Sequence, residues 1–304
     1  MSDLSSKKRA TGAVQKAIVG KCGEALDNLS GSAVSPQDVH TARKAIKKAR
    51  AWLRLLRTGT SQQAFREQNR ALRDAARPLS EGRDAQVLIE TLHELFKRYH
   101  QPAPARRFAR FERALHKDRR ATQHRLASSR AGIASTRRLL RRSKGTLTRL
   151  PIKGQDWEVI GAGFEKVYAR GHKNLRTACD GAGPESLHEW RKDAKNLWHE
   201  LQMLEPLWPG VIEEWADQAH RLADYLGDDH DLWVLREASK AKSDDFADAA
   251  DLDALLALID RRRKQLQDKA RLLGARLYEP KPRRLRARIG KYWRLWDQAG
   301  RPDA

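Results

Sequence analysis

The sequence predicts an all-α protein built from two homologous halves. Apolar residues recur at helical spacing along most of the chain, and the alternation typical of strands is nearly absent. Short stretches rich in Gly, Pro, Ser or Asp divide the chain into helices of ordinary length. A motif from the first half also returns in the second half.

The breaks set the expected helix ends. We place them at 29–36, 58–61, 79–83, 101–105, 143–156, 180–184, 206–210 and 226–229. The widest break contains Pro151 and Gly154 and lies near the middle of the chain. It predicts a first half at residues 1–150 and a second half at residues 151–304.

The duplication rests on two pairs of segments. The segment VHTARKAIK at 39–47 is matched 148 positions later by LHEWRKDAK at 187–195. Both copies read apolar-His-x-x-Arg-Lys-x-x-Lys. A second pair, 72–88 and 219–235, repeats at an offset of 147. Two motifs at nearly one offset indicate an internal duplication.

The spacing places the cations of each copy on one face of a helix, beside the apolar face. In the first copy this stripe contains His40, Arg43, Lys47, Arg50 and Arg54. In the second copy it contains His188, Arg191 and Lys195. Each pair of like charges costs a helix about 0.2–0.5 kcal/mol unless an anion compensates. One such stripe is usually a solvated flank, but two in the same register favour a polyanion site.

Two more helices of the first half carry basic edges. These edges consist of Arg66, Arg70, Arg73 and Arg77, and of Arg110, Arg113, Lys117, Arg120 and His124. Together with the first stripe they would line a common groove or pore. The positions in the second half that match the first of these edges are Glu213, Asp217, His220 and Asp224. We therefore expect the first half to hold an anion more strongly.

The composition supports a polyanionic partner. The formal net charge is +22 and the sequence pI is near 10.4. Nucleic acid, inorganic polyphosphate, another phosphorylated polymer or an anionic membrane surface would fit this surplus. Two cysteines make no disulfide framework, and no apolar run is long enough for a secretion signal or a membrane span. These features predict a cytoplasmic protein without membrane insertion.

The two His motifs and the segment YLGDDHDL at 225–232 resemble those of the CHAD family, the histidine-marked α-helical domain that binds inorganic polyphosphate. The resemblance covers essentially the whole chain. It implies one CHAD domain made of two four-helix bundles, related by a pseudo-twofold axis, with a basic central pore that threads polyphosphate. It also implies association with polyphosphate granules.

The resemblance and the basic edges together give the candidate polyphosphate ligands. They are His40, Arg43, Lys44, Lys47, Lys48, Arg50, Arg54, Arg66, Arg70, Arg73, Arg77, Arg83, Arg113, Lys117, Arg120, His188, Arg191, Lys192, Lys195, His220 and His230. The second copy departs from the family pattern, because Trp198 stands where the family usually has Arg. Either the second copy binds polyphosphate less strongly, or His199 and neighbouring helices compensate for the missing cation.

Catalysis is the weaker interpretation. The chain has neither a phosphate-cradling glycine loop nor a convincing set of carboxylates for Mg²⁺, so we expect a binding protein without cofactor or metal. We interpret Asp84 and Asp231 as helix N-caps and 228–231 as a turn, not a metal cluster.

General DNA or RNA binding is the main alternative, because counterion release rewards any basic protein. Single-strand binders interleave aromatic residues with cations, whereas most of the nine Trp residues here occupy apolar, core-like positions. A scaffold role for the Trp-rich segment 292–296 is a further alternative, and docking of a final helix explains that segment better.

Overall fold

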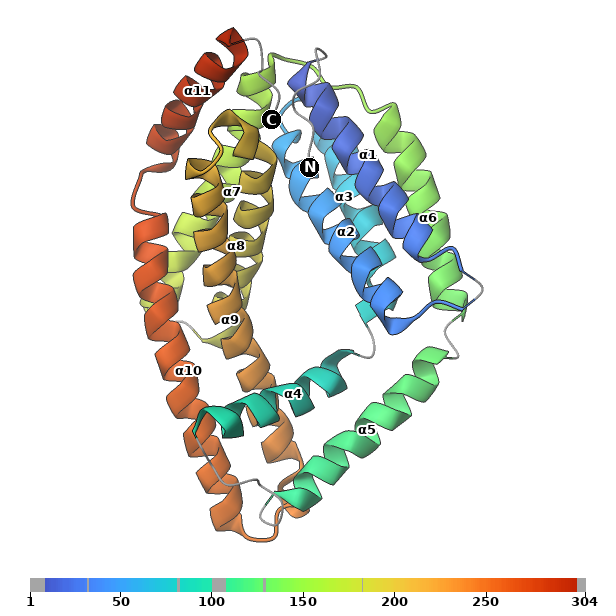
Figure 1. Cartoon of the computed structure of the whole chain (residues 1–304), viewed down its shortest axis with the longest axis vertical. Coiled ribbons are helices and arrows are strands. Elements are labelled where there is room, and N and C mark those ends of the chain that lie inside the picture. Colours follow the sequence, from blue (N-terminus) through green and yellow to red (C-terminus); the bar gives the residue numbers. More distant parts are fainter. Residues whose placement is uncertain are drawn as a thin grey trace.

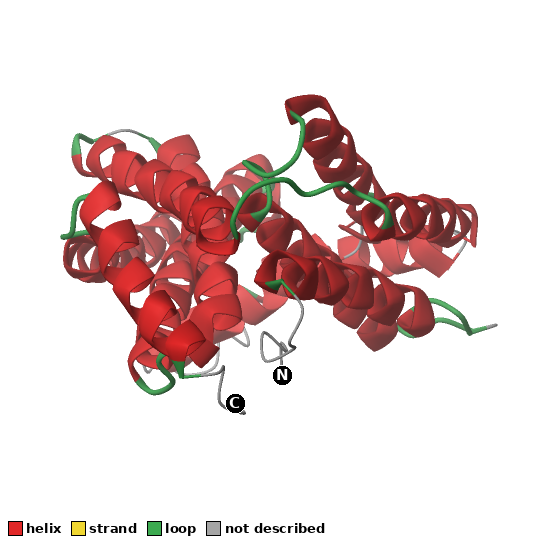
Figure 2. Ribbon diagram, turned by 90° about the horizontal axis from the view of Figure 1, so that it is seen from above, coloured by secondary structure: helices red, strands yellow, loops and turns green. Residues whose placement is uncertain are grey.

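The computed structural model describes residues 9–31, 33–80, 83–99, 108–127, 130–181 and 183–299. Within these ranges it contains eleven α-helices, three short 3₁₀-helices and no strand. Figure 2, coloured by secondary structure, shows helices joined by loops. The α-helices are α1 (Ala10–Asn28), α2 (Pro36–Leu55), α3 (Gln62–Ala76), α4 (Arg83–Arg98), α5 (Ala109–Ala127), α6 (Arg130–Thr148), α7 (Asp156–Cys179), α8 (Pro184–Leu204), α9 (Val211–Ala241), α10 (Ala249–Leu277) and α11 (Pro282–Gln298). The predicted all-α class is confirmed.

Local sequence signals fix the start of α2, the helix that carries the first His motif. Ser35 caps the helix, since its hydroxyl accepts from the Asp38 backbone N–H at 3.1 Å. The Asp38 carboxylate in turn accepts from the Ser35 backbone N–H at 2.9 Å, which completes a capping box. Pro36 occupies the first helical position, where its missing N–H costs nothing. The register of the basic stripe is therefore set from this end.

The helices form two packed groups. Helices α1, α2, α3 and α6 contact one another in a first group, and α7, α8, α9, α10 and α11 contact one another in a second group. Helix α2 joins the groups by packing on α7 and α8. In Figure 1 α2 lies opposite α8 and α9, α4 crosses below them, and α5 lies below α4.

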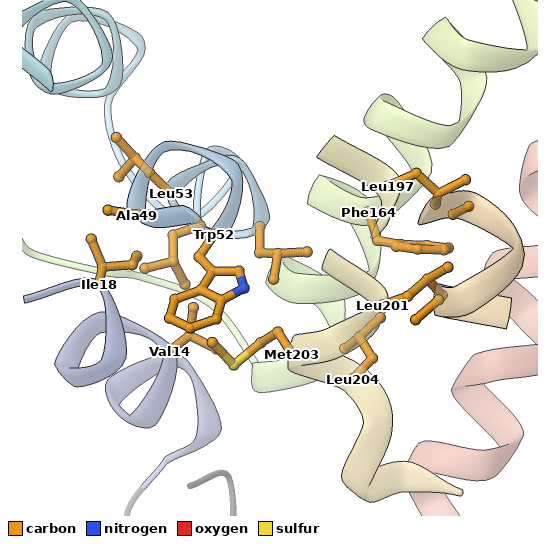
Figure 3. Close-up of a cluster of buried hydrophobic side chains, with 14 of the residues drawn as sticks. Val14, Ile18, Ala49, Trp52, Leu53, Phe164, Leu197, Leu201, Met203 and Leu204 are labelled. Atoms are coloured by element: carbon orange, nitrogen blue, oxygen red, sulfur yellow. The ribbon is translucent and has the colours of Figure 1, made fainter. Parts of the chain in front are cut away.

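The hydrophobic core is continuous across the two halves. One buried cluster contains Val14 and Ile46 from the first half together with Phe164 and Leu201 from the second half. Figure 3 shows the Trp52 ring between the side chains of α1 and Met203 of α8. The predicted boundary after residue 150 falls between α6 and α7, and as a division between two halves it stays a prediction.

Helices α4 and α5 belong to the first half in sequence but pack on the second group. Both α4 and α5 help to form a separate buried cluster with α9 and α10, which includes Leu92, Phe111, Leu235 and Leu255. Figure 1 shows this part at the lower end of the molecule. Two helices of the first half in sequence therefore pack in the core of the second group.

The predicted break at 226–229 is wrong, because α9 runs without interruption from Val211 to Ala241. Gly227 serves a close contact between helices and not a turn, since a Cβ at this position would lie 3.3 Å from Arg191 Nη2. The N-cap role predicted for Asp231 is wrong for the same reason, because this residue lies inside the helix. Its carboxylate lies 3.9 Å from Arg191 Nη1.

The neighbouring Asp229 ties α9 to α10. Its buried carboxylate accepts from Arg263 Nε at 3.1 Å and from Gln267 Nε2 at 2.9 Å. Among the described residues, no group of three or more His, Cys, Asp or Glu residues is placed to hold a metal ion. The segment 228–231 is therefore a helical element whose acids bind basic neighbours.

Other predicted ends agree in part. The break at 143–156 is narrower than predicted, because α6 continues to Thr148 and Ser143 is buried in it. The break at 101–105 lies outside the described residues, as does the Asp84 side chain. Helix α11 docks through buried Trp293 and Trp296, as expected. No helix within the described ranges is long and apolar enough to cross a membrane.

Candidate functional site

Helices α2 and α8 repeat the same pattern of burial as well as the same sequence motif. The buried positions 42, 45, 46, 49, 52, 53, 55 and 56 of the first copy match buried positions 190, 193, 194, 197, 200, 201, 203 and 204 of the second copy. The C-terminal halves of the two helices meet, where Trp52 Nε1 donates to the His199 carbonyl at 2.8 Å. The copies therefore present their remaining faces in the same register.

The N-terminal halves carry the accessible part of each basic stripe. In α2, His40 and Arg43 are half-buried while Lys44 and Lys47 are exposed. In α8, His188, Arg191 and Lys195 are half-buried and Lys192 is exposed. Helix α2 contains six Lys and Arg residues against one acid, Asp38, which its capping box already uses. Helix α2 as a whole therefore has a large excess of positive charge.

The C-terminal half of the first stripe is enclosed. Arg50 Nε donates to Asn69 Oδ1 at 3.4 Å, and the Arg54 guanidinium donates to the Arg50 carbonyl. Burial lowers the pKa of Arg54 to about 10, and nearby Arg50 acts in the same direction. The two arginines that the helical spacing placed beside Lys47 thus lie where α3, α7 and α8 cover α2.

Lys48 lies at the edge of the stripe. Its ammonium group sits 5.0 Å from the centroid of the Trp52 ring. Burial, followed by the charge of Lys21 on α1, lowers its pKa. Lys48 therefore faces α1, and Lys44, Arg43 and Lys47 form the accessible group.

Sequence reasoning missed two buried acids in the second copy. Asp193 accepts from Arg170 Nε at 2.5 Å and from Asn174 Nδ2 at 2.7 Å. Glu200 is fully buried, and neither carboxylate oxygen has a hydrogen-bond partner among the residues described. Burial raises the pKa of Glu200 well above its usual range, against the attraction of Arg54 and Arg170. Both acids occupy positions on the apolar face of α8, and this spacing could have predicted that they are buried.

The second motif brings two predicted histidines together. The rings of His188 and His230 lie with centroids 4.5 Å apart. Burial lowers the pKa of His188 to about 4, and Lys192 and His230 add to the effect. His188 is therefore neutral near pH 7, and its buried Nδ1 has no partner within the described structure. Arg191 lies beside this pair, in the space that Gly227 leaves open.

The family assignment follows from a sequence match over most of the chain. A CHAD domain model matches residues 17–240. The chain belongs to the CHAD domain family. In fold it is similar to PptA from Streptomyces chartreusis, with a TM-score of 0.61 and 13% sequence identity over 88% of this chain and 98% of that chain. No curated protein matches the sequence.

Where the first motif has Arg50, the second motif of this CHAD domain has Trp198, which forms an aromatic stack. The Trp198 ring lies flat on His220, with centroids 3.7 Å apart and an interplanar angle of 10°, and it also contacts His199. His220 in turn lies 3.6 Å from the carboxylate of Asp224. The second stripe therefore carries fewer cations than the first, and whether its neighbours compensate for Trp198 stays a prediction.

The remaining candidates lie on separate helices of the CHAD domain. Arg66, Arg70, Arg73 and Arg77 are exposed along α3 and at its end, and Arg73 pairs with Asp74 at 3.0 Å. Arg113, Lys117 and Arg120 are exposed on α5, at the lower end of the molecule in Figure 1. Arg83 begins α4, and its side chain lies outside the described residues.

His199 should make the stability of this CHAD domain depend on pH. Burial lowers its pKa from 6.5 to about 4, while a hydrogen bond that His199 Nδ1 donates to Gln202 Oε1 opposes the shift and the charges of Lys48, Lys195 and His220 favour it. Between pH 6.5 and pH 4 the His199 imidazole is protonated in the unfolded chain but stays neutral in the folded chain. The free energy of unfolding therefore falls as the pH drops from 6.5 towards 4. We expect His199→Gln to lose roughly 2 kcal/mol less than the wild type between pH 7 and pH 4.5.

Urea unfolding at the two pH values measures this difference. Comparison within each protein cancels the direct effect of the substitution on packing. An equal loss in both proteins would show that His199 takes up a proton in the folded state.

Proposed function

We propose that this CHAD domain binds inorganic polyphosphate, without catalysing its turnover, through the N-terminal halves of α2 and α8. The observation that carries the proposal is the pair of accessible His-Arg-Lys stripes, in one register, on two helices that share a core. Arginine offers a planar fork to phosphate oxygens and lysine a mobile point charge. A chain with one negative charge at each phosphate matches such a row of cations.

We infer that the stripes line a basic central pore between two bundles related by a pseudo-twofold axis. The pairwise packing of α1, α2, α3 and α6, and the matching burial of α2 and α8, support this arrangement. The exposed cations of α3 and α5 would extend the binding surface. A protein with such a site would sit on polyphosphate granules in the cytoplasm.

The first half should contribute more of the affinity. Helix α2 carries six Lys and Arg residues and one acid, whereas α8 carries three Lys and Arg residues and four acids. On α8 and α9, by contrast, Arg191 lies near Asp231 and His220 lies near Asp224. Those carboxylates already satisfy part of the positive charge. Less of it remains for a polyanion in the second half.

Nucleic acid is the competing partner. Proteins that bind single strands stack bases on exposed aromatic rings next to cations. Here Trp52, Trp190, Trp293 and Trp296 are buried, and Trp208 is the exposed tryptophan of the described residues, at 47%. Trp208 packs edge-on against Tyr292 of α11. The half-buried rings of Trp198 and Trp233 already stack on His220 and His230. This arrangement favours polyphosphate over a stacked base.

A competition titration at about 0.15 M salt tests the proposal, since salt weakens diffuse electrostatic binding. Labelled long-chain polyphosphate is bound first, and duplex DNA or RNA is then added at equal phosphate concentration. We expect polyphosphate to stay bound. Displacement by either nucleic acid would make general nucleic-acid binding the better description.

A further inference from the structure

A basic groove lies between α1 and α6, apart from the stripes of α2 and α8. Its volume is about 550 Å³, within the range of about 300–1,000 Å³ typical of small-molecule sites. None of its residues belongs to the stripes of α2 and α8. The cavity is lined by Leu26, Asp27, Ser30, Arg137, Arg141, Lys144, Gly145 and Thr148.

Three cations from successive turns of α6 reach this cavity. Helix α6 contains no acidic residue, so its own sequence offers them no partner. Among the described residues, Arg141 and Lys144 form no ion pair, and Asp27 is the one acid in the lining. The Lys144 side chain extends over α1, where a Cβ on Gly23 would lie 3.5 Å from its Nζ. The cations are thus gathered over a groove with little compensating charge.

The C-terminal end of α1 borders the groove, and its last carbonyls are partly occupied. The final carbonyls of a helix would normally repel phosphate. Here the Leu26 carbonyl accepts from the Leu29 N–H at 3.1 Å, and the Asp27 carbonyl accepts from Ser30 Oγ at 2.7 Å. Two of the final carbonyls of α1 therefore already accept hydrogen bonds from the chain itself. Asp27 remains as an acceptor for a hydroxyl or amino group.

We propose that this groove is a second anion site that takes a compact di- or triphosphate group, either free or attached to a nucleoside. Two guanidinium forks and one ammonium match the oxygens of such a group, and the volume leaves room for more of the ligand. The site is independent of the proposed polyphosphate site, because it shares no residue with it.

A charge-matched pair of variants tests the groove. Arg137→Ala/Arg141→Ala removes two cations that line it, and Arg138→Ala/Arg142→Ala removes two exposed cations one position further along the same helix. Isothermal titration with inorganic triphosphate at about 0.15 M salt should show at least about tenfold weaker binding for the first pair. The second pair should change the affinity by less than about twofold. Equal losses would overturn the proposal in favour of diffuse attraction.

A neutral substitution separates shape from charge. At Gly145 a Cβ would meet only Arg149 Nη2, at 3.9 Å, so a side chain fits there without strain. Gly145→Met would extend into the groove and also favour the helix. We expect it to weaken triphosphate binding at least about fivefold while the melting temperature does not fall. Unchanged binding would overturn the proposal, because a methionine side chain that occupies the groove should exclude triphosphate from it.

Two further titrations identify the source of the phosphate and separate this site from the polyphosphate site. Adenosine triphosphate that binds more tightly than inorganic triphosphate would assign the groove to nucleotides, and equal or weaker binding would assign it to free phosphate chains. Triphosphate should also still bind when Arg43, Lys44 and Lys47 are all alanine. Loss of binding in that variant would place triphosphate on α2 and overturn the second site.

Discussion

Replacement of Arg43, Lys44 and Lys47 by alanine should lower the affinity for long-chain polyphosphate at least about a hundredfold. Hydrogen bonds to charged groups contribute about 1.5–3 kcal/mol each, and about 1.4 kcal/mol corresponds to a factor of ten. Lys44 and Lys47 are exposed and Arg43 is half-buried, so their removal creates no large cavity. The loss of like charges on one helix should also relieve repulsion. Fluorescence titration at about 0.15 M salt measures the affinity.

The matched control removes the same charge elsewhere. Arg284, Lys291 and Arg294 are exposed on α11, at the outer edge of the molecule in Figure 1. Their replacement by alanine should change the affinity by less than about threefold, because exposed charges beyond a Debye length are largely screened. Similar losses in the two triple variants would contradict a defined site on α2 and indicate diffuse basicity.

The register of α2 and α8 was predictable because it depends on local spacing. Side chains three and four positions apart share a face in any α-helix, whatever packs around it. The sequence therefore placed the apolar residues of both motifs correctly, and Ile46, Leu53, Ala194 and Leu201 are all buried. It also placed Arg43 and Lys47 on one face. Such local rules do not say what covers that face further along the helix.

The burial of Arg54 could not be predicted from helical spacing. Helical spacing assigned it to the same stripe as Lys47, but α2 crosses α7 and α8 in its C-terminal half. The crossing places Arg54 near Glu200 and Arg170, whose charges help to set its pKa. Only the tertiary arrangement decides that Lys47 is exposed while Arg54 is enclosed. The affinity of the first stripe is therefore concentrated in its first half.

The role of a glycine is also ambiguous in a sequence. Gly and Asp are typical of turns, so the sequence predicts a turn at 226–229. In the structure Gly227 is helical and leaves space for Arg191. A glycine can serve a bend or a close approach of two helices, and the sequence alone does not separate these uses. Gly161 and Gly163 of α7 likewise allow close packing, against Trp157 and against α2.

Gly163→Ala should destabilise the fold by roughly 3 kcal/mol or more, because the added methyl group would meet backbone and not a flexible side chain. Gly163 lies on α7 where this helix crosses α2, and its Cβ would contact the Leu55 carbonyl and lie 2.6 Å from the Arg54 carbonyl. Helix α2 would have to withdraw from α7 along the core that both halves share. The carbonyls of Arg54 and Leu55 cannot rotate away without loss of the helix.

Gly20→Ala provides the control, since Gly20 is also helical, in α1, and a Cβ there meets nothing within 4 Å. Alanine is favoured over glycine in a helix by up to about 1 kcal/mol, so this variant should be more stable than the wild type. Urea unfolding of both variants measures the two free energies. Opposite signs would show that contact between α2 and α7, and not helix propensity, requires glycine at position 163. A stabilised Gly163→Ala variant would mean that the two helices are further apart, and Arg54 would then be open to a polyanion.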